Sequence, residues 1–194
     1  MDIRLLLISH ASTAAMRAAR FPADDPLDAR GLAETAAARE RLSIPDDAAV
    51  FVSPAACARD TASALGLSAT VQQGLADVDY GLWHGRRLAD LALEAPQDLS
   101  AWTHDPDAAA HGGESFSQLV KRVGRWLDTL DDASSEESRK TQNVIAVTHA
   151  PVIRAAIVYA LAASPAVFSR IEIAPLSTVE LRRSLRGWTW WPAS

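Results

Sequence analysis

Three short apolar runs without polar alternation predict strands that are buried on both faces of a parallel sheet. The runs cover residues 5–8, with Ile3 just before them, residues 49–52 and residues 143–147. A segment with helical patterning follows each run. Strands that alternate with helices in this way predict an α/β fold, a three-layer α/β/α sandwich whose mostly parallel central sheet carries helices on both faces.

Four segments carry helix signals. Asp28 is a good N-cap for a helix that continues towards Leu42, and residues 56–65 predict a second helix. After Ser115, apolar residues recur at the three-and-four spacing of an amphipathic helix. The segment that follows His149 is apolar on more than one face, so we expect it to be largely buried.

The composition predicts one compact globular domain over residues 1–194. Of the 194 residues, 48% are hydrophobic and 22% are charged, and no low-complexity tract divides the chain. The formal net charge of -5 argues against nucleic acid or an anionic membrane surface as a partner. No apolar stretch reaches membrane-spanning length, and the single cysteine suits a reducing compartment. We therefore expect a cytoplasmic protein.

Parallel sheets of this type place their ligand site beyond the carboxyl ends of the strands. His10, Ser53 and His149 each follow a predicted strand and are therefore expected to converge on one crevice. An imidazole with one free nitrogen can attack phosphorus, a second imidazole can neutralise the phosphoryl oxygens, and a carboxylic acid can protonate the leaving oxygen. His10, His149 and Asp77 are the candidates for these three roles.

An ordered set of motifs covers almost the whole chain and resembles the histidine phosphatase superfamily (branch 1), which is phosphoglycerate mutase-like. The resemblance makes His10 the nucleophile that becomes a phosphohistidine, His149 the second pocket histidine and Asp77 the general acid. The matching stretches are Ile8-Ser9-His10-Ala11-Ser12-Thr13, Asp25-Pro26-Leu27 leading to Gly31, Ser53-Pro54 leading to Thr61-Ala62, Leu75-Ala76-Asp77, Asp79-Tyr80-Gly81, Trp83-His84-Gly85, Gly112-Gly113-Glu114-Ser115 and Val147-Thr148-His149-Ala150.

The chain departs from the family pattern at the two positions whose arginines hold phosphate. Ser9 stands just before the nucleophile, and Cys57 stands on the helix after Ser-Pro. Hydrogen bonds to charged groups contribute roughly 1.5–3 kcal/mol each, so an uncompensated loss of both guanidinium groups costs on the order of a hundredfold or far more in phosphate binding or turnover. Arg17 and Arg20, in the loop after His10, are the best candidates to compensate.

Softer departures surround the same site. Ala11 and Ala150 replace glycines that let the backbone approach a ligand closely. Asp77 is one methylene shorter than the customary glutamate, and His84 also stands where the family has glutamate. His84, together with His111, is expected to line the mouth of the site.

The sequence leaves three functions open. We favour a phosphatase-like enzyme that hydrolyses a small phosphorylated metabolite through a phosphohistidine at His10, with mutase activity less expected. The alternatives are a catalytically silent family member that binds a ligand or protein partner in the same cleft, and a hydrolase for a less anionic substrate.

We expect no cofactor and no metal site. His84, His104 and His111 match no tight ligand motif, and a single cysteine removes the usual zinc clusters, so Cys57 is interpreted as a small packed residue. The C-terminal stretch, residues 171–191, predicts short strands around turns, and its apolar side chains leave room for a homodimer.

Overall fold

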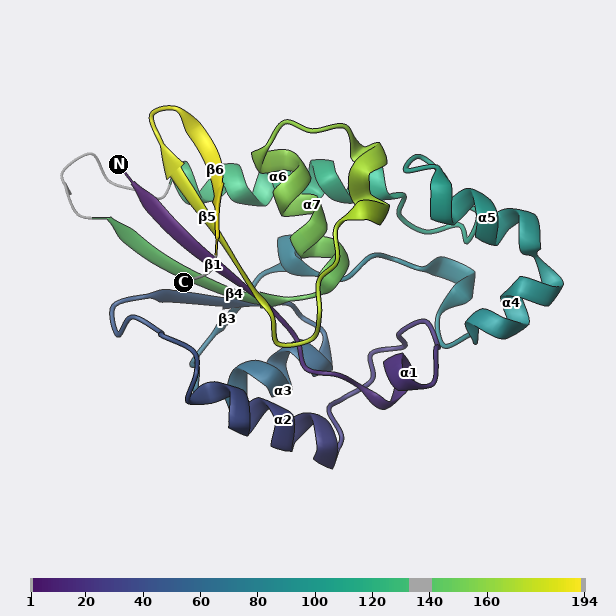
Figure 1. Ribbon diagram of the computed structural model, residues 1–194, viewed down its shortest axis with the longest axis horizontal. Helices are drawn as coiled ribbons and strands as arrows, with labels where there is room; N and C mark the ends of the chain where they lie inside the picture. The colour runs from purple at the N-terminus through teal and green to yellow at the C-terminus, as the bar shows by residue number, and fades with distance from the viewer. Residues whose placement is uncertain (1, 133–140, 193–194) are drawn as a thin grey trace.

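The computed structural model describes residues 2–132 and 141–192, whose strands form a six-stranded sheet in the order β3-β2-β4-β1-β5-β6 (Figure 1). The pairs β1–β4, β4–β2 and β2–β3 are parallel, whereas β5 runs antiparallel to both β1 and β6. This arrangement confirms the prediction of a mostly parallel sheet. The strands are β1 (Ile3–Ser9), β2 (Ala49–Val52), β3 (Thr70–Val71), β4 (Gln142–Thr148), β5 (Thr178–Ser184) and β6 (Gly187–Trp191).

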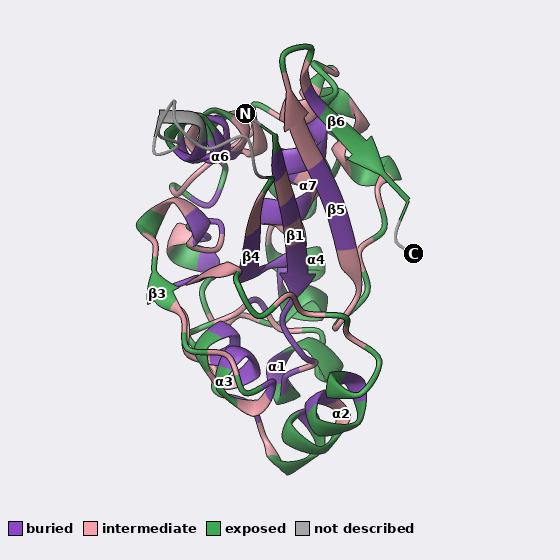
Figure 2. Cartoon of the chain, turned by 90° about the vertical axis from the view of Figure 1, so that its left-hand side faces the viewer, coloured by how far each residue is buried: buried purple, intermediate pink, exposed green. Residues whose placement is uncertain are grey.

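Helices cover both faces of the sheet. Helices α6 (Phe116–Asp132) and α7 (Ala150–Ala160) pack on one face, and α2 (Ala29–Arg39) and α3 (Ala56–Ala64) lie on the other (Figure 1). Figure 2 shows β1 and β4 buried for most of their length between these layers. The three-layer α/β/α sandwich expected from the alternation of strands and helices is therefore confirmed.

Side chains alternate along the central strands, so each strand contributes to two cores. Leu5 and Leu7 of β1 pack in the core that contains the apolar residues of α6 and α7. Ile8 points to the opposite face, where it packs with Ala58 and Ala62 of α3. Because successive side chains of a strand project to opposite faces, an uninterrupted apolar run is what a strand between two helical layers requires.

The helix ends follow local signals in the sequence. The Asp28 side chain accepts a hydrogen bond from the Gly31 N–H and so caps α2, which ends at Arg39 and not near Leu42. Ser115 caps α6 in the same way, since its hydroxyl accepts from the Gln118 N–H. The Gln118 side chain in turn accepts from the Ser115 N–H, which completes a reciprocal capping box.

The remaining short elements include α1 (Ala14–Arg17), η2 (Gly81–Trp83), α4 (Leu88–Glu94) and α5 (Pro96–His104), which lie beyond the carboxyl ends of β1 and β4 (Figure 1). Two further 3-10 turns are η1 (Gln73–Leu75) and η3 (Pro165–Arg170). The rings of Phe21, Trp83 and Trp102 pack with centroids 5.3 to 5.9 Å apart. They join α5 to η2 and to the segment that follows α1. Among the helices described, none is both long and apolar enough to cross a bilayer.

Candidate active site

His10 lies directly after β1, with its side chain buried and one ring nitrogen fixed by the backbone. Its backbone N–H donates to the Thr148 carbonyl at 2.8 Å, which ties the residue to the end of β4. The Nδ1 atom lies 2.8 Å from the Ala11 carbonyl oxygen. A carbonyl can only accept, so Nδ1 carries the proton and Nε2 keeps its lone pair. Burial, followed by repulsion from His149, lowers the pKa of His10 to about 4, and the ring is therefore neutral at pH 7.

His149 caps α7 at the end of β4 and faces His10. The two ring centroids are 4.9 Å apart at an angle of 65°. The Nε2 atom of His149 lies 2.8 Å from the Ser53 hydroxyl, and burial lowers the pKa of His149 to about 3. Its Nδ1 atom is 3.3 Å from an Asp77 carboxylate oxygen and is a buried atom without a hydrogen-bond partner. Ser53, which follows β2, therefore joins His10 and His149 as expected.

Asp77 is a partly buried acid whose carboxylate lies next to the His149 ring. The Val78 N–H donates to its carboxylate at 2.8 Å. Burial outweighs this hydrogen bond and raises the pKa of Asp77 to about 6. A carboxyl group of this kind keeps its proton in mildly acidic solution, as a general acid must.

Arg122 of α6 holds the loop that carries Asp77, and the sequence did not predict this role. The guanidinium donates to the backbone carbonyls of Gly74, Ala76 and Asp77 at 3.0 to 3.1 Å. It also grips the Glu114 carboxylate with two hydrogen bonds of 2.7 and 2.8 Å. Glu114 belongs to the Gly-Gly-Glu-Ser motif. This motif is therefore the sequence feature that could have indicated the interaction with Arg122.

A cavity of about 500 Å³ opens beside the two histidines. The charged residues of its lining are mainly acidic. Arg20 is the one arginine among the lining residues that the structure describes. The lining residues are His10, Thr13, Ala15, Met16, Arg20, Pro22, Asp24, Asp25, Pro54, Ala55, Cys57, Ala76, Asp77, Val78, Asp79, Tyr80, His84, His149, Ala150 and Pro151. A pocket of this size admits a small metabolite.

Of the two arginines expected to compensate for the missing pair, only Arg20 reaches the cavity. Its guanidinium lies 3.5 Å from the carboxylate of Asp25, which lines the cavity too. Arg17 instead forms an ion pair with Asp28 and donates to Ser12, which holds it away from the lining. The local geometry of the loop after α1 therefore decides which arginine is available.

Three other arginines that lie near the site in sequence are not among the residues that line the cavity. Arg86 pairs with Glu94, and Arg154 donates to the Ile171 carbonyl. Arg59 donates to the Pro54 carbonyl. Ser9 is buried and does not line the cavity, because its strand directs it away from the face that His10 occupies.

Cys57 lies in the first turn of α3 and lines the cavity close to the histidines. Burial, followed by the nearby Asp77 carboxylate, raises the pKa of its thiol to about 12, so the free thiol stays protonated at pH 7. The N-terminus of α3 beside it already holds an anion, since the Asp24 carboxylate accepts from the Ala56 N–H at 2.7 Å. A phosphate group would have to displace or share this position.

His84 and His111 differ in their placement. His84 lines the cavity, where its two ring nitrogens lie 2.9 Å from the Pro22 carbonyl and 3.2 Å from the Asp79 carboxylate. The Pro22 carbonyl, and then Asp79, raises the pKa of His84. His111 does not line the mouth as expected, because it is fully buried against Tyr80 and Trp83.

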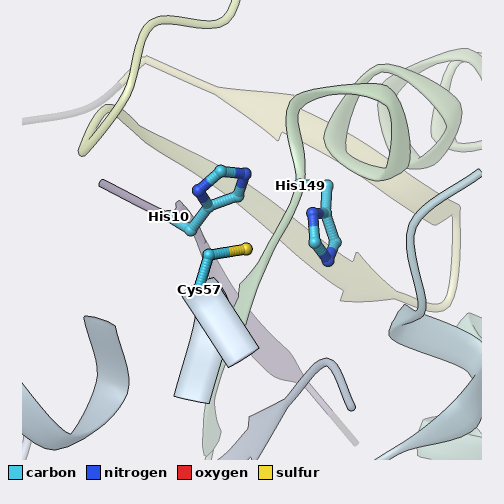
Figure 3. Close-up of side chains that lie close together, drawn as sticks. All are labelled: His10, Cys57 and His149. Atoms are coloured by element: carbon cyan, nitrogen blue, oxygen red, sulfur yellow. The ribbon is translucent and has the colours of Figure 1, made fainter. Parts of the chain in front are cut away.

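His10, Cys57 and His149 bring one potential metal-ligand atom each to within 4.8 Å of one another. Figure 3 shows the Cys57 sulfur directed towards the space between the two imidazoles. All three side chains are buried. The sequence predicted that all three residues belong to one site but predicted no metal site there, because a single cysteine removes the usual zinc clusters.

The six-stranded α/β sheet carries two facing imidazoles beyond its strand ends, and the fold matches phosphoglycerate mutase-like structural neighbours. The model of the histidine phosphatase superfamily (branch 1) matches residues 5–191, and the chain belongs to this superfamily.

Relatives of known sequence and structure agree with this membership. The chain is 31% identical over 186 residues to a bifunctional protein of Mycobacterium tuberculosis, which covers 91% of this chain and 50% of that protein. It thus spans about half the length of that relative. It is 26% identical over 163 residues to phosphoserine phosphatase 1 of Hydrogenobacter thermophilus, covering 79% of this chain and 74% of that protein. A solved mycobacterial glucosyl-3-phosphoglycerate phosphatase superposes with a TM-score of 0.85 at 25% identity, and 100% of both chains is covered.

Proposed function

We propose that the chain hydrolyses a small phosphomonoester through a phosphohistidine on Nε2 of His10. The observation that carries this proposal is the state of the His10 ring, which is neutral, fixed through Nδ1 and directed with its free nitrogen towards the cavity. A nucleophile needs such a free lone pair and a fixed direction of attack. The phosphatase names of two relatives support the same reaction class.

The reaction divides into two displacements at phosphorus. In the first, Nε2 of His10 forms a bond to phosphorus, the ester P–O bond breaks, and the leaving oxygen takes the proton of Asp77. In the second, water attacks the phosphohistidine, its proton returns to the Asp77 carboxylate, and the N–P bond breaks to release inorganic phosphate. When Ser53 donates to Nε2 of His149, the Nδ1–H of that ring can donate to a phosphoryl oxygen.

The substrate class follows from the charges and size of the cavity. Arg20 is the arginine among the described residues that line the cavity, and the acids Asp24 and Asp25 oppose a highly charged ligand. These charges favour a phosphomonoester with one phosphoryl group and an uncharged or cationic remainder over a bisphosphate.

The test is steady-state turnover of a panel of small phosphomonoesters, measured with a metal chelator present. His10→Ala should abolish turnover, whereas His104→Ala, which changes an exposed histidine at the end of α5, should leave it unchanged. Mass spectrometry of protein quenched with substrate should find one added phosphoryl group, absent from His10→Ala. Turnover that survives His10→Ala would refute the proposal.

A second candidate function is silent binding in the same cavity, and the acidic lining is the observation that favours it. Asp24, Asp25, Asp77 and Asp79 line the cavity, and Arg20 is the single arginine among the lining residues that the structure describes. If neither the natural chain nor His10→Ala turns over any phosphomonoester, the silent-binding function becomes the better explanation.

A further inference from the structure

The cluster of His10, Cys57 and His149 has the composition of a metal site. The three residues lie after β1, in the first turn of α3 and at the start of α7, so rigid elements hold them in place. Their ligand atoms lie within 4.8 Å of one another, and Figure 3 shows the sulfur and the two rings grouped around one space. Two imidazoles and a thiol are ligands that zinc prefers.

Both imidazoles already have the outer hydrogen bonds that orient metal-bound histidines. Nδ1 of His10 lies 2.8 Å from the Ala11 carbonyl oxygen, and Nε2 of His149 lies 2.8 Å from the Ser53 hydroxyl. Metal-binding histidines usually donate their second ring N–H to such an oxygen. This leaves Nε2 of His10 and Nδ1 of His149 for a ligand, and the latter is buried without a hydrogen-bond partner.

The spacing is close to that of a bound ion. Three atoms no more than 4.8 Å apart can all lie within about 2.8 Å of one central point, whereas zinc bonds are about 2.0–2.1 Å to nitrogen and about 2.3 Å to sulfur. Each nitrogen would therefore move inward by up to about 0.8 Å, and the sulfur by up to about 0.5 Å, to reach these bond lengths. Small side-chain rotations can supply such a shift without moving the strand or helix ends.

We propose that His10 Nε2, His149 Nδ1 and Cys57 Sγ bind one Zn²⁺ ion. The thiol proton leaves to solvent as the sulfur binds the ion, and Ser53 then accepts a hydrogen bond from Nε2 of His149. A carboxylate oxygen of Asp77, 3.3 Å from Nδ1 of His149, adds negative charge beside the ion. The fourth position faces the cavity, as in zinc sites that keep one position open.

The acidic lining of the cavity fits a cation better than it fits a phosphate. Of the acids that act on the Cys57 thiol, Asp77 and Asp24 line the cavity, and a single arginine opposes them in the described lining. The ion would also occupy the lone pair of His10 Nε2. A consequence that rests on the proposed function is that Zn²⁺ and phosphoryl transfer exclude each other.

Metal binding to the full chain tests the proposal in the absence of any phosphate ester. Chelator-treated protein is titrated with Co²⁺, which binds like zinc but absorbs light, and then with Zn²⁺. We expect one ion per chain, with a thiolate-to-cobalt band in the near ultraviolet that Zn²⁺ removes. Cys57→Ala should abolish that band and weaken Zn²⁺ binding by about tenfold or more.

Two further variants keep the test decisive. Cys57→Ser retains a small polar side chain in case the alanine variant fails to fold, and it should also lack the near-ultraviolet band. His104→Ala changes an exposed histidine at the end of α5 and should bind Zn²⁺ as the natural chain does. Unchanged Zn²⁺ affinity in both Cys57 variants, or a loss of affinity in His104→Ala alone, would overturn the proposed site. Because phosphatase activity is measured with a chelator present, failure of one proposal leaves the other standing.

Discussion

Replacing Arg122 by methionine should destabilise the protein and displace the acid of the site. The Arg122 side chain is only 21% exposed, and its guanidinium makes five hydrogen bonds to Glu114 and to the carbonyls of Gly74, Ala76 and Asp77. Breaking a buried ion pair from one side costs about 3–5 kcal/mol. Because this pair retains some exposure, we expect the lower end, about 3 kcal/mol. That loss corresponds to a fall in Tm of about 6–12 °C for a chain of this length.

The same variant should change the pH dependence of turnover. Arg122 is one of the charges that lower the pKa of Asp77, so its removal should raise that pKa further. The alkaline limb of the rate profile should then move to higher pH, an effect that a purely structural defect would not produce. Release of the Asp77 carbonyl should also reduce kcat by about tenfold or more, because the acid loses its position.

Thermal unfolding and steady-state kinetics of three matched variants check this reasoning. Arg125→Met changes an exposed arginine on the same helix and should alter stability by less than about 0.5 kcal/mol. The double variant Arg122→Met/Glu114→Gln should be more stable than Arg122→Met alone, since it removes the unpaired carboxylate. The reasoning is wrong if Arg122→Met costs less than about 1 kcal/mol and leaves the rate profile unchanged.

Three further predictions concern pH and backbone packing. Turnover should be greatest near pH 5. His10 is neutral above its pKa of about 4, and Asp77 is protonated below its pKa of about 6, and both conditions are needed. A rate plateau that extends above pH 7 would contradict this assignment. Stability should fall by about 1.4 kcal/mol per pH unit as the pH drops from 6 to 4. In that window unfolding lets His10 and His149 take up one proton each, because their native pKa values are depressed. Asp77 gives up one proton, because its native pKa is raised. Urea unfolding at several pH values measures the slope of stability against pH, and a slope of zero would contradict these shifts. Gly113→Ala should lower the free energy of unfolding by about 2 kcal/mol or more, because the added Cβ would lie 2.0 Å from a backbone oxygen. Urea unfolding measures this loss, and a loss below about 0.5 kcal/mol would show that the loop relaxes to accommodate the Cβ.

Local patterns in the sequence were enough to predict the framework. The run at residues 49–52 corresponds to β2, and the Asp28 and Ser115 caps mark the starts of α2 and α6. Apolar runs and cap residues act over a few positions, so they can be recognised without knowledge of the tertiary structure. The convergence of His10, Ser53 and His149 also followed from the sequence, because parallel strands bring their carboxyl ends to one edge.

Tertiary structure decided what surrounds those histidines. Arg17 ends α1 and Arg20 lies three residues further on, yet of the two only Arg20 lines the cavity, because an ion pair with Asp28 holds Arg17 elsewhere. Arg122 reaches three carbonyls of a distant loop, and Cys57 meets two histidines from other elements. Such contacts depend on how helices pack against the sheet and on side-chain rotamers, and no local sequence pattern records either. The sequence by itself therefore determined the fold and the convergence of the strand-end residues, whereas packing determined which charged side chains surround them.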